Sequence, residues 1–121
     1  MDKKIEYDEK FFVAGATGMV GSAIKRALLK HQYGNINKGG FILSPTRREL
    51  NLLNQTDVND WFLKNKPTVV ILAAAKVGGI LANNNFPADF LLENIKIQTN
   101  VIDSAFKSGV KRLLFLGSSC I

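Results

Sequence analysis

Short apolar runs alternate along the chain with longer amphipathic segments, and turn-forming residues separate the two. The apolar runs predict strands at residues 10–14, 41–44, 68–73 and 112–116, of which the last two are expected to be buried. The amphipathic segments predict helices at residues 19–32, 55–65 and 87–108. This alternation predicts an α/β fold, a Rossmann-type parallel sheet with right-handed crossovers and helices on both faces. Its expected strand order is 3-2-1-4.

The predicted helices have recognisable ends and faces. Thr56 is expected to cap the second helix. Pro87 suits the first turn of the longest helix, and Gly109 suits the residue that closes it. Apolar residues wrap more than one face of that helix, so we expect it to contact both the sheet and another helix. These residues are Phe90, Leu91, Ile95, Ile97, Val101, Ile102, Ala105 and Phe106.

The first predicted strand leads into a glycine-rich turn and then directly into a helix. Gly15 would form the tight turn, Gly18 would let the backbone approach a pyrophosphate, and Gly21 would let the helix lie close to the strand. The unpaired N–H groups and the positive dipole at the start of a helix favour an anion. We therefore predict a dinucleotide-binding turn, with an ordinary glycine-containing turn as the alternative.

The end of the second predicted strand indicates which dinucleotide is bound. Enzymes that use NAD normally carry an acidic residue here, which accepts a hydrogen bond from the ribose 2′-hydroxyl group. This chain has Ser44, followed by Arg47 and Arg48. A carboxylate would repel a 2′-phosphate, whereas a guanidinium group can donate two hydrogen bonds to it. We predict NADP(H), with Arg47 as the main contact; alternatively, both arginines lie on an exposed turn and pair with Glu49.

Composition and charge narrow the class of protein. The chain has 121 residues, of which 46% are hydrophobic and 21% charged, as in globular domains. No apolar run approaches the roughly 20 residues that cross a bilayer, and the charged start lacks a signal-peptide core. A single cysteine excludes an internal disulfide and fits a reducing compartment, so we expect a cytoplasmic location without membrane contact.

The net charge of +6 raises the question of nucleic-acid binding. The basic residues are scattered from Lys3 to Arg112 rather than gathered into a stripe, so we expect no nucleic-acid partner. The one histidine, His31, is expected at the surface near the end of the first helix.

Four strings of residues carry a more specific signal. They are GMVGSAI from Gly18, TRRELNLL from Thr46, LAAAKVGGI from Leu72 (with ANN and PADF after it), and LLFLGSSCI from Leu113. From Phe11 to its end, the chain resembles the GDP-L-fucose synthases, a family of the extended short-chain dehydrogenase/reductase superfamily. The resemblance implies an NADPH-dependent oxidoreductase and isomerase that converts GDP-4-keto-6-deoxy-D-mannose to GDP-L-fucose. It also implies a homodimer formed through the helix at residues 87–108.

The resemblance implies a role for each matching residue. Ser118 corresponds to the hydroxyl group that hydrogen-bonds the sugar keto group, and Cys120 to an acid/base residue of epimerisation. A thiol can exchange protons if its neighbours lower its pKa. The alternatives are a serine that merely ends a strand and an inert buried thiol. No metal is expected. The residues implied to bind the cofactor are Gly15, Ala16, Thr17, Gly18, Met19, Val20 and Gly21 at the pyrophosphate, Arg47 at the 2′-phosphate, Asn51 and Leu52 beside the adenine, Leu72, Ala73 and Ala74 at the nicotinamide-side ribose, and Leu116, Gly117, Ser118 and Ser119 under the nicotinamide.

The chain also departs from the family pattern. Bacterial members often carry Arg where Thr17 stands, and the Gly34–Gly40 loop is longer than usual. The superfamily's Tyr-x-x-x-Lys pair does not occur, because neither Tyr7 nor Tyr33 has Lys four residues later. We therefore expect residues 1–121 to be the N-terminal portion of an NADP-binding Rossmann domain, inactive without the rest of that domain and the substrate domain. A non-catalytic dinucleotide-binding module, or another nucleotide-sugar epimerase or dehydratase, is the alternative.

Overall fold

The structure is a computed structural model that describes residues 4–15, 18–46, 48–73 and 87–115. In the last of these ranges, the side chains are described from Leu92 onward. All the strands and helices expected from the sequence are found, with small shifts at their ends. The expectation that the last strand is buried is wrong: it lies at the edge of the sheet, and Leu114 and Phe115 are exposed. The loop at residues 33–40 also contains a short 3₁₀ helix. The elements are β1 (Lys10–Ala14), α1 (Met19–Lys30), η1 (Ile36–Lys38), β2 (Phe41–Leu43), α2 (Gln55–Asn65), β3 (Val69–Leu72), α4 (Pro87–Ser108) and β4 (Arg112–Phe115).

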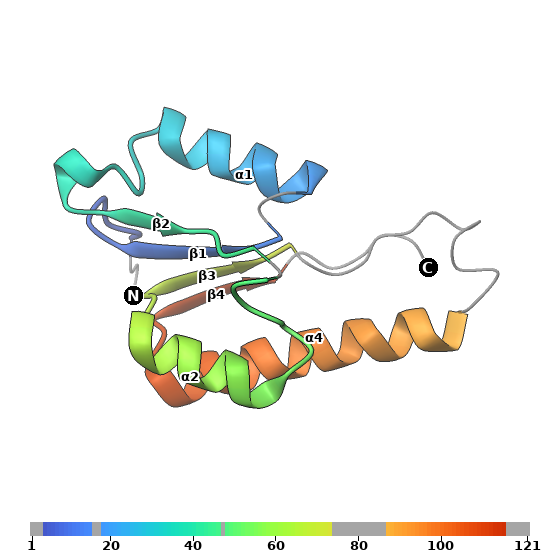
Figure 1. Cartoon of the computed structure of the whole chain (residues 1–121). Coiled ribbons are helices and arrows are strands. Elements are labelled where there is room, and N and C mark those ends of the chain that lie inside the picture. Colours follow the sequence, from blue (N-terminus) through green and yellow to red (C-terminus); the bar gives the residue numbers. More distant parts are fainter. Residues whose placement is uncertain (1–3, 16–17, 47, 74–86, 116–121) are drawn as a thin grey trace.

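The four strands form one parallel sheet in the order β2-β1-β3-β4. Helix α1 covers one face, and α2 and α4 lie together on the other (Figure 1). The Rossmann-type α/β fold with helices on both faces is therefore confirmed.

The arrangement of the strands differs in one respect from the literal order 3-2-1-4. β1 pairs with β2 as expected, but β3 lies between β1 and β4 rather than outside β2. A right-handed crossover places its helix on one face when the chain moves one way along the sheet, and on the opposite face when it moves back. Because α2 shares a face with α4 and not with α1, the chain must return across β1 to form β3.

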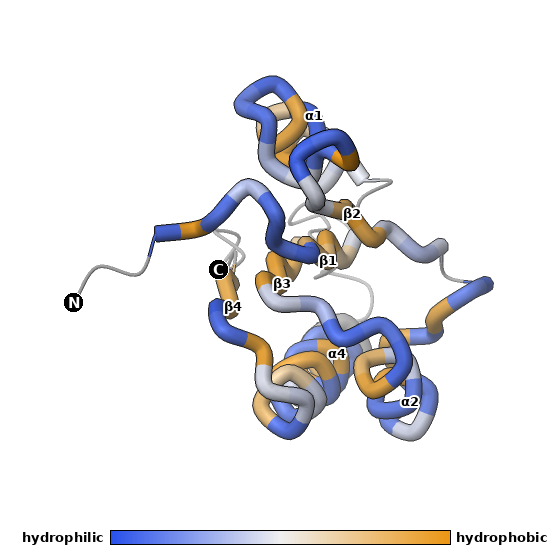
Figure 2. Tube along the Cα trace, turned by 90° about the vertical axis from the view of Figure 1, so that its left-hand side faces the viewer, coloured by the Kyte–Doolittle hydropathy of each residue, from blue (hydrophilic) through white to orange (hydrophobic). Residues whose placement is uncertain are grey.

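Alternate residues of the central strands build two cores, one on each face of the sheet. Figure 2 shows these apolar strands between α1 on one side and α2 and α4 on the other. The core under α1 contains Phe11, Val13, Val69 and Ile71, with Ile24 and Leu28 of α1 packed against it. The core under α2 and α4 contains Phe12, Ala14, Leu50, Val58, Phe62, Val70, Leu72, Ile97, Val101 and Ala105. Burial on both faces explains why these strands are continuously apolar.

Helix α2 is fixed by its cap and by aromatic packing. Asn54 caps it, because its side-chain oxygen accepts a hydrogen bond from the backbone N–H of Asp57 at 3.1 Å. The expectation that Thr56 caps the helix is thus wrong: the helix begins at Gln55, which makes residue 54 the position that reaches the third helical N–H. The ring of Phe12 lies 4.5 Å from that of Trp61 and 5.5 Å from that of Phe62. The sheet therefore holds α2 through aromatic contacts.

The N-terminal segment and the Gly34–Gly40 loop pack together at the amino ends of the strands. The rings of Tyr7 and Tyr33 stack with their centres 4.9 Å apart. Gly40 lies so close to this segment that an added Cβ atom would stand 2.4 Å from the Tyr7 carbonyl oxygen. The two tyrosines thus have a structural role at the edge opposite to the carboxyl ends of the strands.

Two neighbouring residues of α2 offer a matched test of this packing. Phe62 is fully buried, whereas the side chain of Leu63 is 59% exposed. We expect Phe62→Ala to lower the free energy of unfolding by about 3–5 kcal/mol through lost burial and a new cavity. Leu63→Ala should change it by less than about 1 kcal/mol. Urea denaturation of the purified protein measures both, and equal losses would contradict the described packing of α2.

Candidate dinucleotide-binding site

The topology of the sheet marks one place where a ligand is expected. From β1 the chain moves to β2 on one side, and after β2 it returns to β3 on the other side of β1. In open α/β sheets, ligands lie outside the carboxyl ends of the strands at such a switch point. Here β1 ends at Ala14 and β3 at Leu72, and the backbone N–H of Ala73 donates to the Ala14 carbonyl at 2.9 Å. The two segments that leave the sheet at this point are therefore held side by side.

The glycine turn after β1 has the backbone that the sequence predicts. Gly15 has a φ of +87°, in the left-handed region that glycine adopts without strain. The N–H of Gly18 donates to the Gly15 carbonyl at 3.0 Å and closes the turn. Gly21 is buried, as expected of a glycine that lets α1 lie close to the sheet. The contacts of this turn with a cofactor remain a prediction.

The start of α1 is open to an anion. Its N-cap is Gly18, which has no side chain to bond the first N–H groups of the helix, and the first turn contains no acidic residue. Met19 is 88% and Val20 53% exposed, so this helix end lies at the surface. Backbone N–H groups and the helix dipole therefore present positive charge beside the carboxyl end of β1. This part of the site fits a diphosphate.

At the end of β2, a hydroxyl group of the chain meets the ammonium group of a lysine from α1. Lys25 of α1 extends to this strand, and its Nζ atom donates a hydrogen bond to Ser44 Oγ at 3.3 Å. Ser44 occupies the place where an NAD-binding chain would have a carboxylate. The electrostatic environment here thus favours a phosphate over a hydroxyl group on the adenosine ribose.

The turn that follows is closed by two reciprocal hydrogen bonds. The backbone N–H of Thr46 donates to Glu49 Oε1 at 3.0 Å, and the N–H of Glu49 donates to Thr46 Oγ1 at 3.3 Å. The backbone N–H of Thr46, helped by its hydroxyl group, lowers the pKa of the Glu49 carboxyl. Arg48 is exposed on this turn. The carboxylate of Glu49 is therefore directed to Thr46.

The segment proposed beside the adenine is held from α4. Asn51 is exposed, and its Oδ1 atom accepts from the N–H of Leu53 at 3.1 Å. The half-buried Leu52 has its carbonyl bonded by Nδ2 of Asn100 at 2.9 Å. Asn100 is itself only 8% exposed. Asn100 thus holds this segment from α4, and no local sequence pattern suggested the contact.

At the end of β3, Leu72 has no exposed surface, because its side chain packs in the core with Phe12. Leu72 therefore offers no surface to a ribose here, whereas Ala73 is partly exposed. The remaining predicted site residues lie outside the described residues. They are Ala16, Thr17, Arg47, Ala74, Leu116, Gly117, Ser118, Ser119 and Cys120.

The described residues contain no group of three or more His, Cys, Asp or Glu side chains that could hold a metal ion. His31 closes α1 at the surface, as expected. None of the helices within the described ranges is long and apolar enough to cross a membrane.

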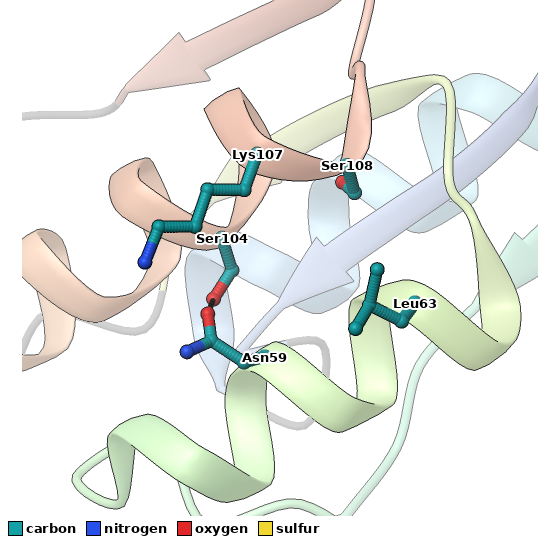
Figure 3. A pocket seen from close by; sticks show the side chains of 5 residues that line it. All are labelled: Asn59, Leu63, Ser104, Lys107 and Ser108. Carbon is teal, nitrogen blue, oxygen red and sulfur yellow. Dashed lines mark hydrogen bonds between the residues drawn. The ribbon is translucent and has the colours of Figure 1, made fainter.

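A hollow between α2 and α4 is separate from the candidate site. It is lined by Asn59 and Leu63 of α2 and by Ser104, Lys107 and Ser108 at the end of α4 (Figure 3). The buried hydroxyl group of Ser104 donates to Asn59 Oδ1 and links the two helices across it. The hollow lies near the last turn of α4, which leads to the amino end of β4, far from the glycine turn. It belongs to the packing of the two helices.

Two glycines with nearly the same left-handed backbone conformation allow a test of the site. Gly15 and Gly39 have φ values of +87° and +83°. Alanine at either position should lower the free energy of unfolding by about 1–2 kcal/mol, since a Cβ atom disfavours this region. Gly15→Ala should also weaken NADPH binding by about tenfold, or 1.4 kcal/mol, because it disturbs the N–H groups at the start of α1. Calorimetric titration measures this affinity, and Gly39→Ala should leave it unchanged. Equal effects of both substitutions on NADPH affinity would contradict the site.

Comparisons with known proteins agree with this geometry. Residues 11–121 match the family model of the NAD dependent epimerase/dehydratase family. GDP-L-fucose synthase 1 from Arabidopsis thaliana is 56% identical over 112 residues, which are 93% of this chain and 33% of the relative. The structure of GDP-mannoheptose C4 reductase from Campylobacter jejuni with NADP bound has a TM-score of 0.83 and 37% identity, over 94% of this chain and 34% of that one.

The structure of a GDP-L-fucose synthetase from Naegleria fowleri bound to NADP has a TM-score of 0.75 and 28% identity, over 93% of this chain and 32% of that one. The chain thus spans about a third of the length of the relatives it matches. With a family match from Phe11 to Ile121 and the expected glycine turn at the switch point, the chain belongs to the NAD dependent epimerase/dehydratase family.

Proposed function

We propose that this chain is the N-terminal, NADP(H)-binding part of a GDP-L-fucose synthase. The observation that carries the proposal is the turn at Gly15, which leads into an acid-free helix start at the switch point of the sheet. The substrate class is supported by the 56% identity to the Arabidopsis synthase. Residues 1–121 would form the first portion of the cofactor domain, and the substrate domain would lie elsewhere in the whole protein.

NADP(H) is the dinucleotide that the described residues fit best. The backbone N–H groups at the start of α1 would bind the pyrophosphate, and Ser44 in place of an acid leaves room for a 2′-phosphate. Arg47 is the proposed main partner of that phosphate. The NADP-bound state of the Campylobacter and Naegleria relatives supports this choice. When bound, NADPH supplies the hydride for reduction of the sugar ketone.

The proposed reaction begins with epimerisation beside the ketone of GDP-4-keto-6-deoxy-D-mannose. Such a step needs one group that removes a proton and another that returns a proton on the opposite face. The thiol of Cys120 would exchange one of these protons. The hydroxyl group of Ser118 would donate a hydrogen bond to the keto oxygen and stabilise the negative charge that develops there. In the sequence both residues follow β4, which ends at the same end of the parallel sheet as β1 and β3.

A second candidate function is reduction of another GDP-sugar. The favouring observation is the TM-score of 0.83 with the GDP-mannoheptose C4 reductase, which is higher than the 0.75 with the Naegleria synthetase. A reductase without epimerisation would need the proton donor at the keto oxygen but no acid/base thiol. The role of Cys120 therefore separates the two candidates.

Helix α4 is the proposed interface of a homodimer. Among the side chains of α4 that the structure describes, from Leu92 onward, four large apolar ones are exposed at spacings of three, seven and four residues, namely Leu92, Ile95, Ile102 and Phe106. Phe106 is 87% exposed. Such a stripe on one helix is suited to helix–helix contact with a second copy.

Light scattering of the whole protein should give twice the mass of one protomer. The double substitution Phe106→Glu with Ile102→Glu places charges on this face and should lower the measured mass toward that of a single protomer.

We also propose a cytoplasmic location, in keeping with the single cysteine.

Isotope exchange tests the proposed chemistry directly. The whole protein should reduce GDP-4-keto-6-deoxy-D-mannose with NADPH and should incorporate solvent deuterium into the sugar next to the ketone. Cys120→Ser should slow this exchange by about 10²–10⁴-fold, while NADPH affinity stays unchanged. Ser108→Ala, at the far end of α4, is the control. Turnover of another GDP-sugar in preference would contradict the proposed substrate, and undiminished exchange in Cys120→Ser would contradict the role of the thiol.

A further inference from the structure

We infer that Lys25 is a cofactor-specificity residue, whose ammonium group, positioned by Ser44 at the end of β2, binds the 2′-phosphate of NADP(H). The inference rests on the proposed function and extends it to a residue outside the glycine turn and the arginine pair. It concerns discrimination between NADPH and NADH rather than affinity for the dinucleotide as a whole.

The packing of α1 directs Lys25 toward the strand. Ile24 and Leu28 hold the helix against the core under α1. Lys25, next to Ile24, is half-buried, whereas Arg26 and Lys30 of the same helix are exposed. A partly buried lysine stem has fewer directions open to its ammonium group than one in solvent. The 3.3 Å bond from Nζ to Ser44 Oγ shows where that group is held.

The ammonium group has donors to spare at this position. It carries three N–H donors, and the hydroxyl group of Ser44 accepts one of them. The ion pairs of the described residues join Lys107 with Asp103 and Lys111 with Glu9, and none of them includes Lys25. The positive charge of Lys25 is therefore not neutralised by a carboxylate among the described residues. A phosphate beside Ser44 would receive a charge-assisted hydrogen bond.

Ser44 and Lys25 act together in this account. In an NAD-binding chain, the acid at the end of this strand would repel a 2′-phosphate. An acid at the position of Ser44 in this chain would also pair with Lys25 and cancel the charge of its ammonium group. A serine does neither, and its hydroxyl group still orients the ammonium group. A serine rather than an acid at the end of β2 and a lysine bonded to it thus point to the same substituent on the ribose.

The competing explanation is structural, with Lys25 serving only to tie α1 to β2. The two explanations differ in what a substitution changes. If Lys25 only links α1 to β2, its substitution would lower the stability of the fold and would change the affinities for NADPH and NADH to the same extent. A specificity residue would affect only ligands that carry the 2′-phosphate. Methionine keeps most of the apolar stem of Lys25 and removes the charge, so Lys25→Met separates the two.

Calorimetric titration of the whole purified protein with four probes tests the inference. Lys25→Met should weaken NADPH and adenosine 2′,5′-bisphosphate by about 10- to 100-fold, the loss of one charge-assisted hydrogen bond. The affinities for NADH and AMP should change less than about twofold, because neither carries the 2′-phosphate that Lys25 would contact. Lys25→Arg should restore most of the preference for NADPH. Lys30→Met, the same change on an exposed lysine of α1, is the matched control and should bind all four probes as the unsubstituted protein does.

The outcomes distinguish this inference from the function on which it rests. If the unsubstituted protein prefers NADPH and Lys25→Met binds it equally well, or loses NADPH and NADH to the same extent, the role of Lys25 is overturned while the proposed cofactor stands. If the unsubstituted protein shows no preference for NADPH, the proposed cofactor is wrong and the inference fails with it. Selective loss of the phosphorylated probes supports both.

Discussion

The position of β1 between β2 and β3 determines where the other elements of this structure can lie. The strand is buried on both faces, with Phe11 and Val13 under α1 and Phe12 under α2 and α4. Because crossovers are right-handed, the chain must leave β1 in one direction and return past it in the other. The glycine turn after β1 and the segment after β3 are thereby brought to the same point.

The charge around that point follows from a few local arrangements. The start of α1 has a glycine cap and no acid in its first turn, so its dipole is not opposed. At the end of β2, Ser44 meets the ammonium group of Lys25. Glu49 is nearby in the sequence, but hydrogen bonds from Thr46 fix its carboxylate within its own turn. The site therefore combines a helix end suited to a diphosphate with a cation suited to one further phosphate group.

Local sequence patterns predicted the elements of the fold well, because their causes are local. The run FFVA is apolar on both faces, and Gly109 closes α4 with a φ of +81°. The glycines at 15 and 21 also have the conformation and burial that their spacing suggested. The order of the strands was less accessible, since it depends on which face α2 occupies. That choice is made by contacts of Val58 and Phe62 with Val101 and Ala105, residues more than 35 positions apart in the sequence.

The same distinction applies to the candidate site. The contacts Lys25–Ser44 and Asn100–Leu52 join residues 19 and 48 positions apart, and no local pattern announces them. The roles of Arg47, Ser118 and Cys120 rest on resemblance, and these residues lie outside the described part of the chain.

Hydrogen–deuterium exchange of the backbone with and without NADPH is the most direct test of the central claim, because it reports on the N–H groups themselves. NADPH is expected to slow exchange at Met19, Val20 and Gly21, and to leave exchange unchanged at Lys107 and Ser108 beside the hollow between α2 and α4. Unaltered exchange at the start of α1 under saturating NADPH, or protection confined to α2 and α4, would contradict the claim.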